Sequence, residues 1–175
     1  PANVLLARMN RRRLDAESWR DALLAATGVL DNRIGGPSID PDQPDERRRT
    51  IYSRASRLEL NKMLSLFDYP DANVHSERRV ETTTPLQKLF VMNSPLMVAT
   101  ADRFAARVIA ESPNDPPRQI DRAYILLFGR EPSDAECQLG VEFIGTFGGD
   151  AESVTKGWSQ YAQVLLAAND LLFVD

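Results

Sequence analysis

The sequence offers few side chains for nucleophilic or metal chemistry, because its 175 residues contain one histidine, His75, and one cysteine, Cys137. A single histidine excludes a multi-histidine metal site and confines any histidine-based triad to this position. His75 lies in the polar segment "NVHSERR", without the G-x-S-x-G context of a nucleophile. The surroundings therefore favour a solvated loop histidine over a catalytic one. A single cysteine excludes an internal disulfide and a cysteine-cluster metal site.

The carboxylates form no distinctive acid/base pair. Asp40, Asp42 and Asp45 alternate as D-x-D in a loop, but the glycine and the bidentate glutamate of a calcium loop are missing. No glycine-rich phosphate loop is present either, since Gly35-Gly36 precede a proline and Gly148-Gly149 end a helical pattern. We therefore expect no metal and no cofactor in this chain.

Arginine is the strongest electrostatic feature, in the runs Arg11–Arg13 and Arg47–Arg49 and at Arg78 and Arg79. Residues 1–79 carry 14 Lys+Arg and 12 Asp+Glu, a net charge of +2, whereas residues 80–175 carry 7 and 13, a net charge of −6. One interpretation is that these arginines pair with helix C-termini and acidic loops. The other is a basic face, formed by the two runs, that meets an acidic partner. The net charge of −4 and the scarcity of nearby aromatic side chains argue against a nucleic-acid partner.

The stretch "TTTPLQKLFVMNSP" predicts a helix with strong boundary signals. Thr84 is placed as the N-cap, Pro85 as the first helical residue and Gln87 as the reciprocal member of a capping box. The helix then runs over Leu86, Leu89 and Phe90 and ends near Asn93.

Ser94 and Pro95 repeat the cap-and-proline start at once, so a second helix follows at a sharp angle to the first. This corner brings Arg79, Thr83, Gln87 and Asn93 close together in sequence, and these four could line a polar binding notch. Alternatively, Gln87 and Asn93 satisfy the unpaired backbone groups of two helix ends.

The rest of the sequence predicts mainly helices. Further helix starts are predicted at Asp15, at Ser56 with Glu59, at Asp115, and at Ser133 with Glu136, and a last helix covers about 151–169. Residues 34–46 are rich in glycine and proline and read as a surface loop, and "TIY" near 49–53 is the only strand candidate. We expect an all-α fold, a compact bundle of about six helices with at most one short strand near 49–53, over a single domain 1–175. No apolar run approaches the ~18–20 residues of a membrane span.

Five segments, in order, resemble a known family: "NRRRLDAESWRDALLAATGVLDNRIGGP", "LFDYPDAN", "RRVETTTPLQKLFVMNSP", "LLFGREPSDAE" and "WSQYAQVLLAANDLLFVD". Together they resemble the carboxy-terminal planctomycete-specific domain of unknown function that is number fifteen-fifty-three in its series. Members usually begin well upstream of Pro1, so the resemblance implies the carboxy-terminal part of a larger domain. Members often have a cysteine shortly before the "TTTP" segment, where this chain has His75-Ser76, so no thiol role carries over.

The resemblance implies architecture rather than chemistry. Such domains occur in large exported proteins, beside a companion domain and often a c-type haem domain, which implies a periplasmic or cell-surface location. This chain has no C-x-x-C-H sequence, so any c-type haem belongs elsewhere in the parent protein. The family has no established catalytic residues to transfer.

Two functional hypotheses remain open. The first is a non-catalytic helical interaction or structural module that packs against other domains of the parent protein, which predicts an exposed apolar patch. The alternative is part of an enzyme acting on polysaccharide, with a site near the 79–95 helix corner. That alternative requires a cleft holding an acid/base carboxylate pair.

Overall fold

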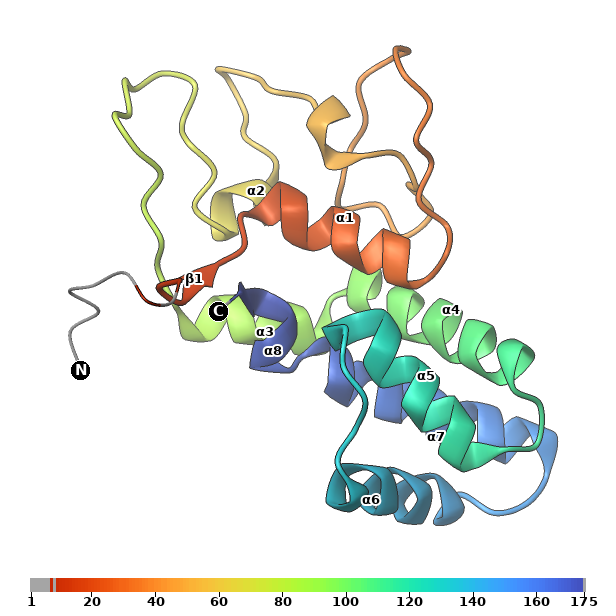
Figure 1. The fold of residues 1–175 in the computed structure, drawn as a ribbon. Coiled ribbons are helices and arrows are strands. Elements are labelled where there is room, and N and C mark those ends of the chain that lie inside the picture. The colour runs from red at the N-terminus through yellow and green to blue at the C-terminus, as the bar shows by residue number, and fades with distance from the viewer. Residues whose placement is uncertain (1–6, 8, 175) are drawn as a thin grey trace.

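The computed structural model describes residue 7 and residues 9–174, and their fold is mainly helical (Figure 1). In chain order the elements are β1 (Arg12–Arg13), α1 (Ala16–Ala26), the 3-10 helix η1 (Thr50–Tyr52), α2 (Lys62–Leu66), α3 (Pro85–Asn93), α4 (Pro95–Glu111), α5 (Pro116–Phe128), α6 (Asp134–Gly145), α7 (Ala151–Leu166), α8 (Asn169–Leu172) and β2 (Phe173–Val174). The expectation of a helical bundle is confirmed. None of the helices in the described residues is long and apolar enough to cross a lipid bilayer.

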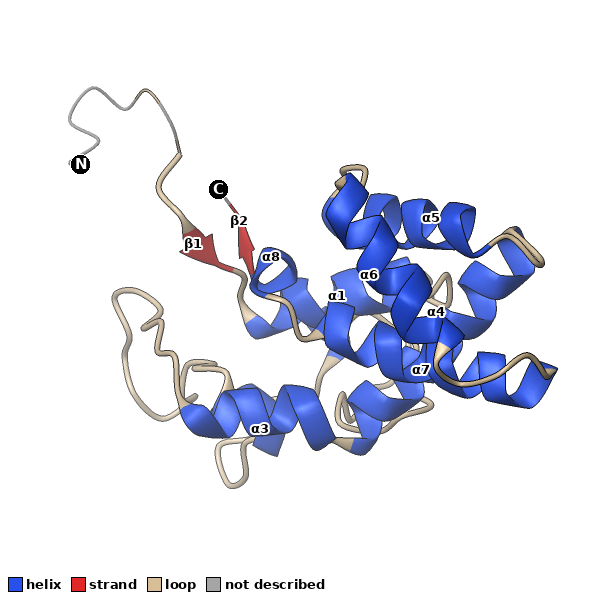
Figure 2. Cartoon of the chain, turned by 90° about the horizontal axis from the view of Figure 1, so that it is seen from below, coloured by secondary structure: helices blue, strands red, loops and turns tan. Residues whose placement is uncertain are grey.

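Helices α4 and α7 pack side by side at the centre, with α5 and α6 beside them (Figures 1 and 2). Their shared core includes the fully buried Phe104 and Trp158, and the Trp158 indole donates a hydrogen bond to Gln119 Oε1 at 2.7 Å. Helix α1 packs on the other side of α4, under a region made mostly of loops. One continuous cluster of buried apolar side chains joins α1 to this bundle.

Most helix boundaries follow from local signals, as predicted. A side-chain oxygen accepts a hydrogen bond from a first-turn backbone N–H at five of the six predicted caps, namely Asp15, Thr84, Ser94, Asp115 and Ser133. Gly129 closes α5 with a positive φ of 67°, a conformation that favours glycine. The chain end that follows α7 combines one short helix, α8, with the extended residues of β2.

The predicted strand near 49–53 is wrong, because Thr50–Tyr52 form the 3-10 helix η1. Asp21 on α1 accepts hydrogen bonds from both the backbone N–H and the hydroxyl of Thr50, each at 2.7 Å, which holds a tight turn against the helix. The small sheet in the described residues is instead the antiparallel pair β1–β2, with Arg12 opposite Val174 and Arg13 opposite Phe173. Because its strands lie 160 residues apart in the chain, sequence pattern gave no sign of it.

The helix start predicted at Ser56 and Glu59 is also wrong. The Ser56 hydroxyl accepts from the backbone N–H groups of Leu58 and Glu59, but this forms only a turn. Helix α2 begins later, after Asn61, whose side chain caps the N–H of Leu64 at 3.1 Å.

The segment 34–46 is held to the body by a buried arginine. Arg20 on α1 has no exposed surface, and its guanidinium donates to the carbonyl oxygens of Pro41 at 2.9 Å and Glu46 at 2.7 Å. It also donates to Arg48 O at 2.9 Å. Hydrogen bonds from one buried cation therefore organise backbone that has no helix or sheet of its own.

The close packing of α6 gives a stability test. A Cβ at Gly140 would lie 2.7 Å from both Ile120 Cδ1 and Tyr161 Oη, whereas a Cβ at Gly145 would meet no atom within 4 Å. We expect Gly140→Ala to lower the free energy of unfolding by about 1–3 kcal/mol through overpacking. Gly145→Ala on the same helix should be neutral or slightly stabilising. Urea unfolding of both variants measures the contrast, and equal stability of the two would contradict this packing.

Candidate functional site

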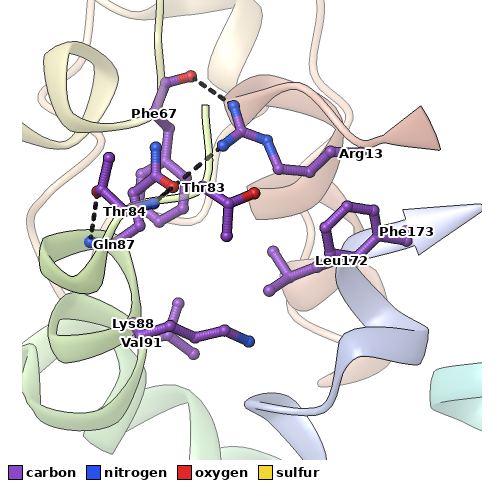
Figure 3. A pocket seen from close by; sticks show the side chains of 9 residues that line it. All are labelled: Arg13, Phe67, Thr83, Thr84, Gln87, Lys88, Val91, Leu172 and Phe173. Atoms are coloured by element: carbon purple, nitrogen blue, oxygen red, sulfur yellow. Dashed lines mark hydrogen bonds between the residues drawn. The ribbon is translucent and has the colours of Figure 1, made fainter. Parts of the chain in front are cut away.

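The most extensive polar network near the predicted corner centres on Arg13, whose side chain is buried (Figure 3). Its guanidinium pairs with Asp68 Oδ2 at 2.6 Å and donates to Gln87 Oε1 at 3.2 Å. It also donates to the carbonyl oxygens of Phe67 and Thr82. We call Arg13, Asp68, Thr82, Thr84 and Gln87 the Arg13 cluster. It joins β1, the end of α2, the start of α3 and the loop between those helices.

Asp68 serves as an acceptor at the centre of this cluster. It adopts a left-handed backbone conformation, with φ of 62°, that turns the chain after α2. Its carboxylate accepts from Thr82 N at 2.9 Å and from Thr82 Oγ1 at 2.7 Å. Burial acts to raise the pKa of Asp68, but the hydrogen bonds from Thr82 and Arg13 outweigh it, so the pKa lies below its ordinary value. The carboxylate is therefore held in its charged form.

Gln87 uses its side-chain amide to complete two helix ends. Its Oε1 accepts from Thr84 N at 3.0 Å, which forms the predicted capping box, and its Nε2 donates to Leu66 O at 2.8 Å at the end of α2. The Arg13 guanidinium also donates to Oε1, so both the oxygen and the nitrogen of the buried amide have hydrogen-bond partners. The interpretation that Gln87 satisfies unpaired backbone groups describes this geometry.

A small cavity lies between this cluster and the chain end. Figure 3 shows Thr83, Thr84 and Gln87 on one side and Leu172 and Phe173 on the other. The space in this cavity is about 20 Å³, which holds roughly one water molecule. Pockets for small organic ligands are at least an order of magnitude larger, ~300–1,000 Å³.

The four residues predicted as a site do not form one notch. Thr83 and Gln87 line this cavity, but Arg79 lies in a neighbouring groove. The Arg79 guanidinium forks onto both carboxylate oxygens of Glu17 on α1, each at 2.7 Å, and these hydrogen bonds raise its pKa. Asn93 lies exposed at the far end of α3, where its amide donates to Leu89 O at 3.0 Å. A binding role for the four remains a prediction.

Sequence reasoning missed Arg13, Asp68 and Thr82 as the centre of the network. Arg13 was marked only as one member of an arginine run. The partners of Arg13 lie 54 to 74 residues from it in the chain, so no local spacing marks them.

Three apolar side chains of α3 face away from the core. Leu86 and Leu89 are 64% and 54% exposed, and Met92 one turn further is 54% exposed. The buried positions are Gln87 and Val91. Because Gln87 must face inward to reach Leu66 and Thr84, the side chains on the opposite face point to solvent. We call Leu86, Leu89 and Met92 the α3 stripe.

Several arginines of the two runs form contacts within the domain. Beyond Arg13, Arg48 stacks on the Tyr52 ring at 4.2 Å and Arg49 pairs with Asp21 at 3.3 Å. Arg11 lies over the Phe173 ring at 4.8 Å. These contacts fit the interpretation of pairing within the domain, and an acidic partner for the two runs stays a prediction.

The other candidates for chemistry lie apart from one another. His75 is exposed in the loop before α3. Asp45 pairs with Arg103 at 2.7 Å, while Asp42 is partly buried, so that burial and the neighbouring Asp40 raise its pKa. Burial also raises the pKa of the Cys137 thiol. Among the described residues, no group of three or more His, Cys, Asp or Glu side chains is arranged to hold a metal ion.

These observations define a mainly helical domain in which buried guanidinium groups join distant backbone segments. Residues 1–144 match the model of the family described as PSD1, protein of unknown function (DUF1553). The chain belongs to this family, so the predicted resemblance is confirmed; four of the five segments lie within the matched residues, and the fifth, 158–175, lies beyond them. Neither the search of curated proteins nor that of solved structures gave a match.

The Arg13–Asp68 pair can be tested through pH. We expect Asp68→Asn to destabilise the domain by about 1–3 kcal/mol at pH 7, because Arg13 stays buried without its counter-charge. Asparagine tolerates the left-handed backbone, so the change isolates the charge. The folded pKa of Asp68 is below the unfolded value of about 3.9, so the carboxylate's contribution is complete above that value and is lost as pH falls through the folded pKa.

The stability difference between the two proteins should therefore be constant above about pH 5 and shrink below about pH 4. Chemical unfolding at a series of pH values measures it. Asp71→Asn, at an exposed position in the same loop, is the matched control and should change stability by less than about 0.5 kcal/mol. A difference that persists at the lowest pH would show that the charge of Asp68 is not what holds the cluster.

Proposed function

We propose that this domain is a non-catalytic helical interaction module of a larger exported protein, and that the α3 stripe packs against another domain of the same polypeptide. The observation that carries the proposal is an exposed helix face without charge. The exposed residues of α3 are Pro85, Leu86, Leu89, Met92 and Asn93. Exposed apolar surface of this kind, gathered on one element, is typical of an interaction site.

The charge-free character extends beyond the helix itself. Between Thr82 and Ala101 the only charged residue is Lys88, which is half-buried and donates to Asn169 Oδ1 at 2.8 Å. The exposed faces of other helices differ, since α4 presents Asp102 and α6 presents Asp134 and Glu142. The α3 stripe is therefore set apart from the ordinary polar surface of this bundle.

Both ends of α3 are anchored to the body. The Arg13 cluster holds its first turn, and the Gln163 amide of α7 donates to Met92 O at its last turn. A helix fixed at both ends presents its outer face with little loss of conformational freedom on binding, which favours association.

The size of the stripe favours a tethered occupant. A nine-residue helix is ~14 Å long and ~10 Å wide, so its outer face covers on the order of 150 Å². Stable interfaces between separate proteins bury ~800 Å² per partner. A domain on the same chain meets this small face at a high effective concentration, which offsets the weak contact.

The setting of this module comes from the family resemblance. Members occur in large exported proteins, so we place the domain in the periplasm or at the cell surface, with any c-type haem in another domain of the parent. The alternative is part of an enzyme acting on polysaccharide near residues 79–95. Its general acid would need a raised pKa, whereas Asp68 has a lowered one and is engaged by Arg13 and Thr82. The geometry supports the interaction module better.

Hydrogen exchange tests the proposal in the intact parent polypeptide. We expect the amides of α3 to exchange more slowly there than in the isolated chain, because another domain covers the stripe. Leu89→Asp should restore fast exchange in the intact protein while changing the stability of the isolated chain little, since the side chain is exposed.

Leu139→Asp is the matched control, because Leu139 is a similarly exposed leucine, 65% accessible, on α6. It should leave the exchange of α3 unchanged. Equal exchange of α3 in the isolated chain and in the intact protein would refute a tethered occupant on this face.

A further inference from the structure

Residues 71–81, within the connection between α2 and α3, are all exposed. Both ends are fixed, since Asp68 binds Thr82 at the base and Asn73 Nδ2 donates to Arg57 O at 2.8 Å. Within the part of the chain that the structure describes, no backbone group of residues 75–81 makes a hydrogen bond to another backbone group. These seven successive residues are exposed and make no backbone ladder, and the Arg78 carbonyl accepts one local hydrogen bond, from the Ser76 hydroxyl at 2.6 Å.

Such a segment meets the main requirement of a protease substrate. Exposed loop tips with unpaired backbone are preferred sites of cleavage, because a protease binds several residues in extended form. The segment contains Arg78 and Arg79. Arginine fits the S1 pocket of serine proteases that carry an aspartate at its base.

The two arginines differ in availability. Arg78 is exposed, and among the described residues its guanidinium has no hydrogen-bond or ion-pair partner. Arg79 is forked onto Glu17, with Asp15 at 3.7 Å, so its guanidinium must leave two carboxylates before it enters a protease pocket. The geometry therefore favours Arg78 as the residue on the amino side of the cleaved bond.

Three other exposed arginines lie on more constrained backbone. Arg54 N donates to Ile39 O at 2.9 Å, beside a bridge between Ile39 and Ser53. Arg57 lies in the turn made by Ser56, and its carbonyl accepts from Asn73 Nδ2. The backbone N–H of Arg33 donates to the Asp31 carboxylate at 3.0 Å. Each would have to open these contacts before it could bind in extended form, whereas Arg78 would release only the hydrogen bond from Ser76.

We infer that the Arg78–Arg79 peptide bond is a processing site for a serine protease with an acidic S1 pocket. Water adds across this bond, leaving a carboxylate on Arg78 and an amine on Arg79. The product is a two-chain domain of residues 1–78 and 79–175. It stays assembled, because Arg13 and Asp68 bind Thr82 across the cut and the Phe67 ring packs on Phe90 at 5.7 Å.

Limited digestion of the folded chain with trypsin tests the site. We expect the first cut after Arg78, identified by the masses of the two fragments, and a nicked product that elutes as one species in size exclusion and separates in denaturant. Arg78→Gln should slow this first cut roughly 10-fold or more, because glutamine lacks the charge that the pocket binds. Arg57→Gln, a matched change in a neighbouring loop, should leave the rate unchanged.

Glu17→Gln tests separately whether the Arg79–Glu17 ion pair protects Arg79. The substitution weakens this ion pair, so trypsin should then cleave the Arg79–Val80 bond as well as the bond after Arg78. A first cut after Arg54 or Arg57, equal cleavage after Arg78 and Arg79 in the unmodified chain, or fragments that separate without denaturant would each overturn the inference. These outcomes do not depend on the α3 stripe, so they leave the proposed function untouched.

Discussion

The buried ion pair between Arg13 and Asp68 is the interaction on which the rest of this region depends. Its two side chains are only 6% and 18% exposed, so removing one of them leaves the other buried without its partner. The pair joins β1 to the turn after α2, and Thr82 and Gln87 attach the start of α3 to the same point. One guanidinium thus fixes the relative positions of segments that share no regular secondary structure.

The same device recurs at Arg20, which holds the 34–46 segment against α1. Long connections cost conformational entropy when they are ordered, and this half of the chain has few helices to order them. A guanidinium offers five donors in a rigid fork and so satisfies several carbonyl oxygens at once. The amino-terminal half is therefore organised by buried cations, whereas the carboxy-terminal half is organised by helix packing.

This division explains which features the sequence could predict. Caps such as Thr84, Ser94 and Ser133 act on backbone groups two or three residues away, so spacing alone located α3, α4 and α6. The candidate site depends on contacts of a different kind. Arg13 meets Gln87 across 74 residues, and the register of β1 on β2 decides which arginine of the run points inward. Nothing in the local pattern distinguishes Arg13 from Arg12, so the centre of the site emerges only from the three-dimensional arrangement.

The orientation of α3 shows a conflict between the local apolar pattern and the long-range polar contacts. Apolar periodicity favours burial of Leu86 and Leu89, but the capping box and the carbonyl of Leu66 require Gln87 on the inner face. The polar arrangement prevails in this structure, where the inward-facing Gln87 bonds the Thr84 N–H, the Leu66 carbonyl and the Arg13 guanidinium at once. The leucines on the outer face of α3 are therefore exposed because of the contacts that Gln87 makes on the inner face. The Arg13 cluster therefore determines both the shape of the corner and the surface on which a neighbouring domain would pack.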